Sequence, residues 1–170
     1  SYGNKVEIEG AEVEVIWTPI RNFQALVNAS WMPTAETVED QRPIYSKPGS
    51  TYYENTLTAT QKRDAYILWN ARVENVPEYR FNVFGKYTFT DGPARGLAIG
   101  AGMRYSSETV VSRGVDWNPL GNGYQAGDYM VFDLTATYPW EVMGYKIATS
   151  FGLYNVTDEK YSEGSYALSP

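Results

Sequence analysis

The chain of 170 residues contains no cysteine and no histidine. The missing thiols and imidazoles exclude disulfide bonds, thiol chemistry, histidine-based triads and most zinc sites. Long apolar runs are also lacking, since no stretch approaches the roughly 18 residues of a membrane-spanning helix. The 14 basic and 20 acidic residues give a net charge of −6. This balance argues against nucleic acid as a partner, because phosphate binding requires clustered Lys and Arg.

No constellation of catalytic residues is visible. The stretch from Gly100 to Gly102 lacks the third glycine of a dinucleotide fingerprint. The calcium-like stretch that begins at Asp116 places Leu120 and Gly127 where oxygen ligands are needed. The length indicates one domain. We therefore predict a protein that is not an enzyme and that holds no metal or cofactor.

What the sequence does contain is a regular series of strand-like segments. Short turns at 18–21, 91–95 and 139–144 alternate with long polar loops at 33–77 and 107–127. Turns on one rim and loops on the other predict an up-and-down antiparallel sheet, as in a transmembrane barrel. The predicted strands are 11–17, 22–32, 78–90, 96–106, 128–138 and 145–155.

Each segment has one apolar face and one polar face, because successive side chains of a strand point to opposite sides. In segment 78–90, for example, Tyr79, Phe81 and Val83 alternate with Arg80 and Asn82. Aromatic residues gather at both ends of the apolar faces, as expected at two membrane interfaces. These patterns predict an all-β transmembrane barrel. Soluble sheets alternate too, so a soluble binding module that recognises carbohydrate or protein through Tyr-rich loops remains the alternative.

Six strands are too few for a closed membrane barrel, since the smallest single-chain barrels have about eight. An open edge in lipid would cost several kcal/mol for each unpaired backbone group. We therefore expect residues 1–170 to form part of a larger barrel. A small complete barrel would need two more strands from loop 33–77, including the run 65–73, which we interpret as a strand ended by Pro77.

Four stretches carry a resemblance to a known family. They are EGAEVEVIWTP at 9–19, VPEYRFNVFGKYTFTDGPARGLAIGAGMRY at 76–105, YMVFDLTATY at 129–138 and FGLYNVTDEKY at 151–161. In this order they resemble the C-terminal part of TonB-dependent outer-membrane receptors, the ligand-gated transporters for iron–siderophore complexes and similar scarce nutrients.

The resemblance implies a location in the outer membrane of a Gram-negative bacterium and about six strands of a barrel of the 22-stranded type. It implies that the final barrel strand and the plug domain lie outside this chain. The implied partners are outer-membrane lipid, the protein's own plug and remaining strands, TonB through the absent N-terminal region, and a small ligand such as a metal chelate. A ferric siderophore is the expected ligand, although the loops do not choose among ligands.

Candidate ligand residues are the aromatic and basic side chains of the outer loops, which could stack on and neutralise an aromatic, anionic chelate. Packing within the loops is the alternative role. These residues are Tyr45, Tyr52, Tyr53, Arg63, Trp69, Arg113, Trp117 and Tyr124.

Candidate lumen residues are the charged and amide side chains of the polar faces. Their expected roles are support of the wall and plug or, alternatively, ligand contact. They are Glu12, Glu14, Arg80, Asn82, Lys86, Arg104, Asp133 and Lys146.

Three glycines interrupt the strand pattern. At Gly10 the apolar phase changes, which indicates either a β-bulge or a segment that projects above the membrane. Gly100 and Gly102 remove side chains from one stripe of the polar face. Close approach of a plug or a neighbouring backbone, or simple curvature of the wall, would account for this stripe.

Overall fold

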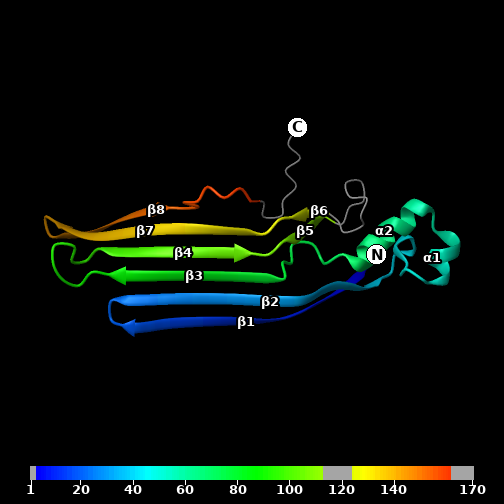
Figure 1. Ribbon diagram of the computed structural model, residues 1–170, viewed down its shortest axis with the longest axis horizontal. Helices are drawn as coiled ribbons and strands as arrows, with labels where there is room; N and C mark the ends of the chain where they lie inside the picture. Colours follow the sequence, from blue (N-terminus) through cyan, green and yellow to red (C-terminus); the bar gives the residue numbers. More distant parts are fainter. Residues whose placement is uncertain (1–2, 113–123, 162–170) are drawn as a thin grey trace.

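The fold is dominated by one antiparallel sheet of six strands, in the order β1-β2-β3-β4-β7-β8 (Figure 1). This computed structural model describes residues 3–112 and 124–161. The all-β, up-and-down prediction is confirmed, because each strand of the sheet pairs with the next one along the chain, apart from the inserted hairpin of β5 and β6. The strands are β1 Asn4–Ile20, β2 Phe23–Asp40, β3 Tyr79–Thr88, β4 Ala98–Ser106, β5 Thr109–Ser112, β6 Tyr124–Ala126, β7 Tyr129–Val142 and β8 Tyr145–Leu153.

The turns at one end of the sheet are tighter than the sequence indicated. Strand β7 continues through most of the predicted turn 139–144, and only Met143 and Gly144 separate it from β8. Both residues have positive φ, 52° and 80°. This is the pattern of a two-residue type I′ turn, whose twist matches that of the paired strands. Similarly, β1 runs on to Ile20 through the predicted turn 18–21.

Strands β1 and β2 extend much further than the predicted ranges 11–17 and 22–32. Their pairing continues from Ile20 to the pair of Asn4 with Asp40. This register accounts for the phase change at Gly10, because two residues of β2, Met32 and Pro33, lie opposite this one glycine. The structure therefore contains both the bulge and the projection, and the extra residue is in β2.

Gly10 is required sterically at this bulge. A Cβ atom at this position would lie 2.4 Å from the carbonyl oxygen of Trp31. Pro33 has no N–H group to donate to a ladder, and bulges are among the few sheet positions that accept proline. The bulge therefore marks the point where the long hairpin leaves the regular sheet.

The predicted loop 33–77 contains helices, and the predicted strand 65–73 is wrong. The elements are the 3₁₀ turn η1 Pro43–Tyr45, α1 Thr51–Thr56 and α2 Ala59–Asn70. A capping box starts α2: the Thr58 hydroxyl accepts from the Gln61 N–H at 3.3 Å, and the Gln61 side chain accepts from the Thr58 N–H at 3.0 Å. This local signal outweighs the β-like composition of the run.

We call residues 33–75 the cap; they lie beyond the long-loop end of the sheet, where α1 and α2 are seen in Figure 1. The cap has its own small core, in which Ala35, Ala65 and Ile67 are buried. Backbone hydrogen bonds tie it down, from Val73 to the carbonyl of Ala35 and from Asn75 to the carbonyl of Val110, both at 2.8 Å. In the described part of the chain, no helix is long and apolar enough to cross a membrane.

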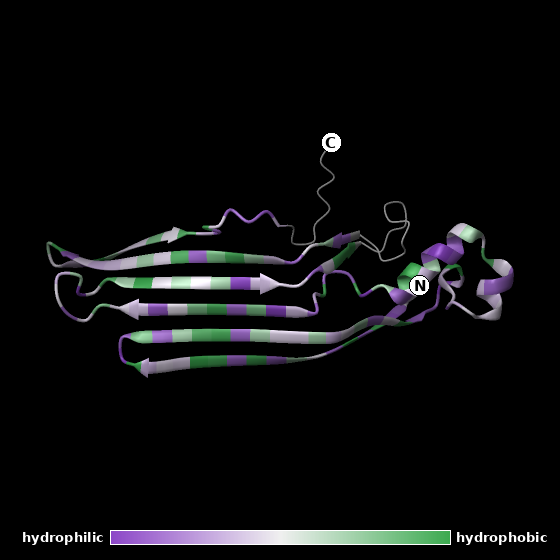
Figure 2. Ribbon diagram, in the orientation of Figure 1, coloured by the Kyte–Doolittle hydropathy of each residue, from purple (hydrophilic) through white to green (hydrophobic). Residues whose placement is uncertain are grey.

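The apolar face of the sheet is open. Figure 2 shows hydrophobic and hydrophilic bands that alternate along the strands. Large apolar side chains on this face remain accessible, among them Trp17 at 58% and Leu134 at 43%. The residues described here place no second layer over this face, so its side chains are not the interior of a two-layer sandwich.

Candidate functional site

The predicted lumen residues share one face of the sheet. Cross-strand partners lie on the same face, so the register fixes this arrangement. Asn82 is opposite Asn28 on one side and Arg104 on the other, and Asp133 is opposite Gly102. By the same register the polar face carries Glu12, Glu14, Arg80, Asn82, Lys86, Arg104, Asp133 and Lys146.

An apolar row crosses this polar face, and the sequence analysis missed it. Ile16 is opposite Leu26, Leu26 is opposite Phe84, and Phe84 is opposite Gly102. A Cβ atom at Gly100 would lie 2.7 Å from the Phe84 ring. An aromatic side chain of the adjacent strand therefore fills the stripe left by the glycines. The signal in the sequence was Phe84, an apolar residue at an even-numbered position of segment 78–90, where the other even-numbered residues are polar.

Asp133 connects two parts of the polar face. One carboxylate oxygen, Oδ2, accepts a hydrogen bond from Arg104 Nε at 3.3 Å. The other oxygen, Oδ1, accepts from the backbone N–H of Asn155 at 2.9 Å. The Asp133 side chain is 17% exposed. Asp133 therefore holds an arginine of the wall and also the chain that follows β8.

We call residues 154–161 the strap. It begins where the pairing of β8 with β7 ends, at Leu153. The Asn155 side chain makes two hydrogen bonds of 2.9 Å to the backbone of Glu159, which closes a compact turn. The N–H of Val156 also donates to the carbonyl of Phe132 at 2.8 Å. These bonds hold most of the stretch FGLYNVTDEKY at 151–161 in a compact conformation.

The strap lies across the polar face of β7. It is held at Asp133 through Asn155, and the ring of Tyr161 stacks on Tyr129 with centroids 4.3 Å apart. Asp133 and Tyr129 flank Val131 on the same face, because residues two apart in a strand point the same way. Val131 is 0% exposed. Since its neighbours on both sides contact the strap, we infer that the strap covers Val131.

Replacement of Asp133 by Ala should release the strap. The change removes the acceptor for the Asn155 N–H and leaves Arg104 without its carboxylate, and each charge-assisted hydrogen bond contributes about 1.5–3 kcal/mol. Hydrogen exchange of amides in residues 154–161 of the intact protein should accelerate by about tenfold or more. Asp133→Asn keeps an oxygen acceptor and should have a smaller effect. Unchanged exchange in both variants would show that Asp133 does not anchor the strap.

Among the predicted ligand residues of the cap, Tyr45 and Trp69 come together. Trp69 Nε1 donates to the carbonyl of Tyr45 at 2.8 Å, and Lys47 Nζ lies 5.5 Å from the Trp69 ring centroid. The Arg42 guanidinium lies 4.2 Å from the centroid of the Tyr45 ring. Hydrogen bonds from Arg42 to Asp40 raise the pKa of Arg42. Much of this polar and aromatic surface is therefore engaged within the cap.

The other predicted ligand residues are dispersed. Tyr53 donates its hydroxyl to the carbonyl of Lys62 at 3.1 Å, which joins α1 to α2. Tyr52 and Arg63 are exposed on these helices. Tyr124 begins β6, and its backbone pairs with Ser112. Arg113 and Trp117 lie outside the described residues, and so does the calcium-like stretch that begins at Asp116, up to residue 123.

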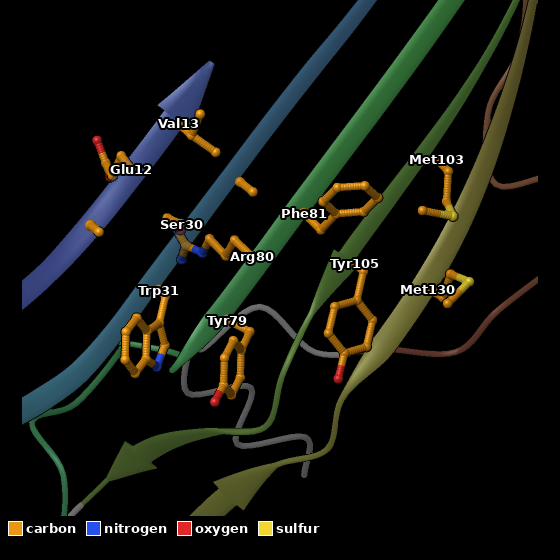
Figure 3. A pocket seen from close by; sticks show the side chains of 12 residues that line it. Glu12, Val13, Ser30, Trp31, Tyr79, Arg80, Phe81, Met103, Tyr105 and Met130 are labelled. Atoms are coloured by element: carbon orange, nitrogen blue, oxygen red, sulfur yellow. The ribbon is translucent and has the colours of Figure 1, made fainter. Parts of the chain in front are cut away.

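A depression of about 620 Å³ lies on the apolar face. Its walls include Trp31, Tyr79, Phe81 and Tyr105, which Figure 3 shows on neighbouring strands. The hydroxyls of Tyr79 and Tyr105 point towards the end of the sheet that carries β5 and β6 (Figure 3). Apolar ring bodies with polar tips at one level of a sheet form an interfacial aromatic belt. This depression therefore lies on the face that the sequence analysis expects to contact lipid, in contrast to the polar face.

Comparison with known proteins gives the same architecture. The protein-family model for the TonB dependent receptor-like β-barrel matches residues 1–156. The ferrichrome outer membrane transporter/phage receptor of Escherichia coli (strain K12) is 33% identical over 63 residues, which are 37% of this chain and 8% of that protein. The chain thus spans a small fraction of this relative.

Solved structures share the fold at low sequence identity. The siderophore receptor PiuA of Acinetobacter baumannii matches with a TM-score of 0.62 and 16% identity, over 93% of this chain and 18% of that one. BauA, the ferric preacinetobactin receptor of the same species, matches with a TM-score of 0.59 and 11% identity, over 94% and 22%. FpvA of P. aeruginosa, in complex with a heterologous pyoverdine and iron, matches with a TM-score of 0.56 and 17% identity, over 93% and 16%.

These matches agree with the transmembrane barrel expected from the sequence, and the family consists of receptors and transporters instead of enzymes. The open six-stranded sheet is part of such a barrel. The family model extends over most of the chain, from the first strand to the strap. The chain therefore belongs to the family of TonB-dependent receptor β-barrels.

Proposed function

We propose that the chain forms part of the wall and outer rim of an outer-membrane transporter that imports a scarce nutrient, specifically a ferric siderophore. The observation that carries this proposal is the family match over residues 1–156. The names of the similar proteins support it, because they concern ferrichrome, ferric preacinetobactin and a ferric pyoverdine.

The proposed orientation follows from the two faces and the two ends of the sheet. The apolar face contacts outer-membrane lipid of a Gram-negative bacterium, and the polar face lines the lumen. The short turns lie in the periplasm, and the cap lies outside the cell. Residues 1–170 are then the C-terminal barrel region without its final strand. The remaining strands, the plug and the N-terminal region that contacts TonB belong to other parts of the protein.

The proposed ligand surface is the outer end of this wall. In the cap, Tyr52 and Arg63 are exposed and available to a ligand, whereas Tyr45, Tyr53 and Trp69 have structural contacts as well. Tyr124, Arg113 and Trp117 belong to the second long connection and complete the proposed set. The large apolar side chains of the sheet are exposed. A soluble binding module would bury such side chains in a core, so their exposure speaks against that alternative.

The test is uptake of radioactive iron by a Gram-negative strain that lacks its own ferric-siderophore receptors and expresses the intact protein. We expect import of at least one ferric siderophore, and we expect this import to stop when TonB is deleted. Failure to import or bind any ferric chelate, in cells where the protein is inserted in the outer membrane, would refute the proposed function.

A further inference from the structure

A polar pocket of about 380 Å³ lies on the lumen face, at the end of the sheet nearest the cap. It is formed where β3, β4 and β7 meet the β5–β6 hairpin. Its size is at the lower end of the range for small-molecule sites, roughly 300–1,000 Å³. We call it the arginine pocket; its walls include Arg80, Asn82, Arg104, Ser106, Thr109 and Tyr129.

The arginine pocket is positively charged. Two guanidinium groups, those of Arg80 and Arg104, line it, and the lining residues within 3–112 and 124–161 include no Asp or Glu. The carboxylate of Asp133 neutralises Arg104 from the side, at 3.3 Å. Among the residues that the structure describes, Arg80 is in no ion pair, and it is exposed. The positive charge of Arg80 is therefore available to a bound anion.

The donors of the arginine pocket suit charged oxygen atoms. A guanidinium presents a planar fork of N–H groups that matches two oxygens of one anion, and such charge-assisted pairs are the stronger hydrogen bonds. Asn82 is the cross-strand partner of Arg104, so its amide lies beside that guanidinium on the same face. We propose that the arginine pocket binds the negatively charged oxygens of an anionic ferric chelate, an inference that rests on the proposed transport function.

The strap preorganises one half of the arginine pocket. Asp133 is held by the Asn155 N–H at 2.9 Å and in turn holds Arg104, while Tyr161 of the strap stacks on Tyr129, another lining residue. A donor fixed before the ligand arrives loses less conformational freedom on binding. Arg104 is thus a fixed element of the pocket, and Arg80 is the adaptable cation that the anion recruits.

The test compares chelates of different charge on the intact, detergent-solubilised receptor by titration calorimetry. The probes are iron(III) citrate, which carries carboxylates, iron(III) catecholate, whose anionic oxygens are phenolates only, and a neutral iron(III) trihydroxamate. Arg80→Gln should weaken binding of an anionic chelate by about tenfold or more, the loss of one charge-assisted hydrogen bond. Arg95→Gln removes the same charge from the turn between β3 and β4 at the far end of the sheet, and should leave the affinity unchanged.

The outcomes separate the inference from the function beneath it. A loss of affinity in Arg80→Gln for either anionic chelate supports the arginine pocket, and a loss for only one of them identifies the kind of oxygen that it recognises. Equal affinities of Arg80→Gln and Arg95→Gln for every anionic chelate would overturn the arginine pocket while transport stands, and so would binding of the neutral chelate alone. If the unmodified receptor binds none of the three probes and imports no ferric siderophore, the proposed function fails and the inference fails with it.

Discussion

Replacement of Gly100 by Ala is expected to destabilise the barrel, whereas the same change at Gly102, two residues along the same strand and face, should be tolerated. A Cβ atom at Gly100 would lie 2.5 Å from Thr135 Oγ1 and 2.7 Å from the Phe84 ring. At Gly102 the nearest atom would be 3.5 Å away, an ordinary contact. Overpacking of this kind costs about 1–3 kcal/mol.

The measurement is the midpoint of thermal unfolding of the intact receptor in detergent. Gly100→Ala should lower this midpoint, and Gly102→Ala should leave it unchanged or raise it slightly, because Ala loses less conformational freedom than Gly on folding. Phe84→Leu in the Gly100→Ala background should recover part of the loss by removing the ring. If Gly100→Ala and Gly102→Ala behave alike, the ring of Phe84 does not fill the glycine stripe in solution.

Replacement of Ile67 by Ala is expected to unfold the cap without opening the sheet. Ile67 is 0% exposed and lies in the small core of the cap, together with Ala35 and Ala65. Truncation of a fully buried Ile costs about 2–5 kcal/mol, and a core of this size has little stability to spare. The six-stranded sheet has its own backbone pairing, so the loss should stay local.

Hydrogen exchange of the intact receptor would show this as faster exchange in residues 59–70, with no change in β3 and β4. Tyr66→Ala is the matched control, because Tyr66 is next to Ile67 in α2 but is 51% exposed. Its exchange should remain close to that of the unmodified protein. Faster exchange throughout the sheet in Ile67→Ala, or no acceleration of exchange in α2, would contradict an independently folded cap.

The barrel wall was largely predictable from the sequence, because alternation with a period of two is a local property. Phe81 and Val83 were assigned to the apolar face and Arg80 and Asn82 to the polar face from their positions alone, and the register agrees. The strand ends were less accurate. Nothing in residues 33–40 distinguishes a loop from a strand until the pairing with residues 4–9 of β1 is known.

The cap was misjudged for a different physical reason. The run around Ile67 and Leu68 is apolar and aromatic enough to suggest a strand, yet Thr58 and Gln61 supply the cap that starts a helix. In a short segment, one satisfied set of terminal N–H groups can outweigh modest strand preferences. The signal was present in the sequence, seven residues before the predicted strand began.

By itself, the sequence determined the number of wall strands, their two faces and their alternating short and long connections, because side-chain alternation and turn chemistry act between near neighbours. Only the tertiary structure decided that Phe84 covers Gly100, that Met32 and Pro33 lie opposite Gly10, and that the strap returns along β7 to contact Asp133 and Tyr129. These contacts join residues far apart in the chain. They depend on which residues the register brings face to face, and alternation along a single strand leaves that pairing open.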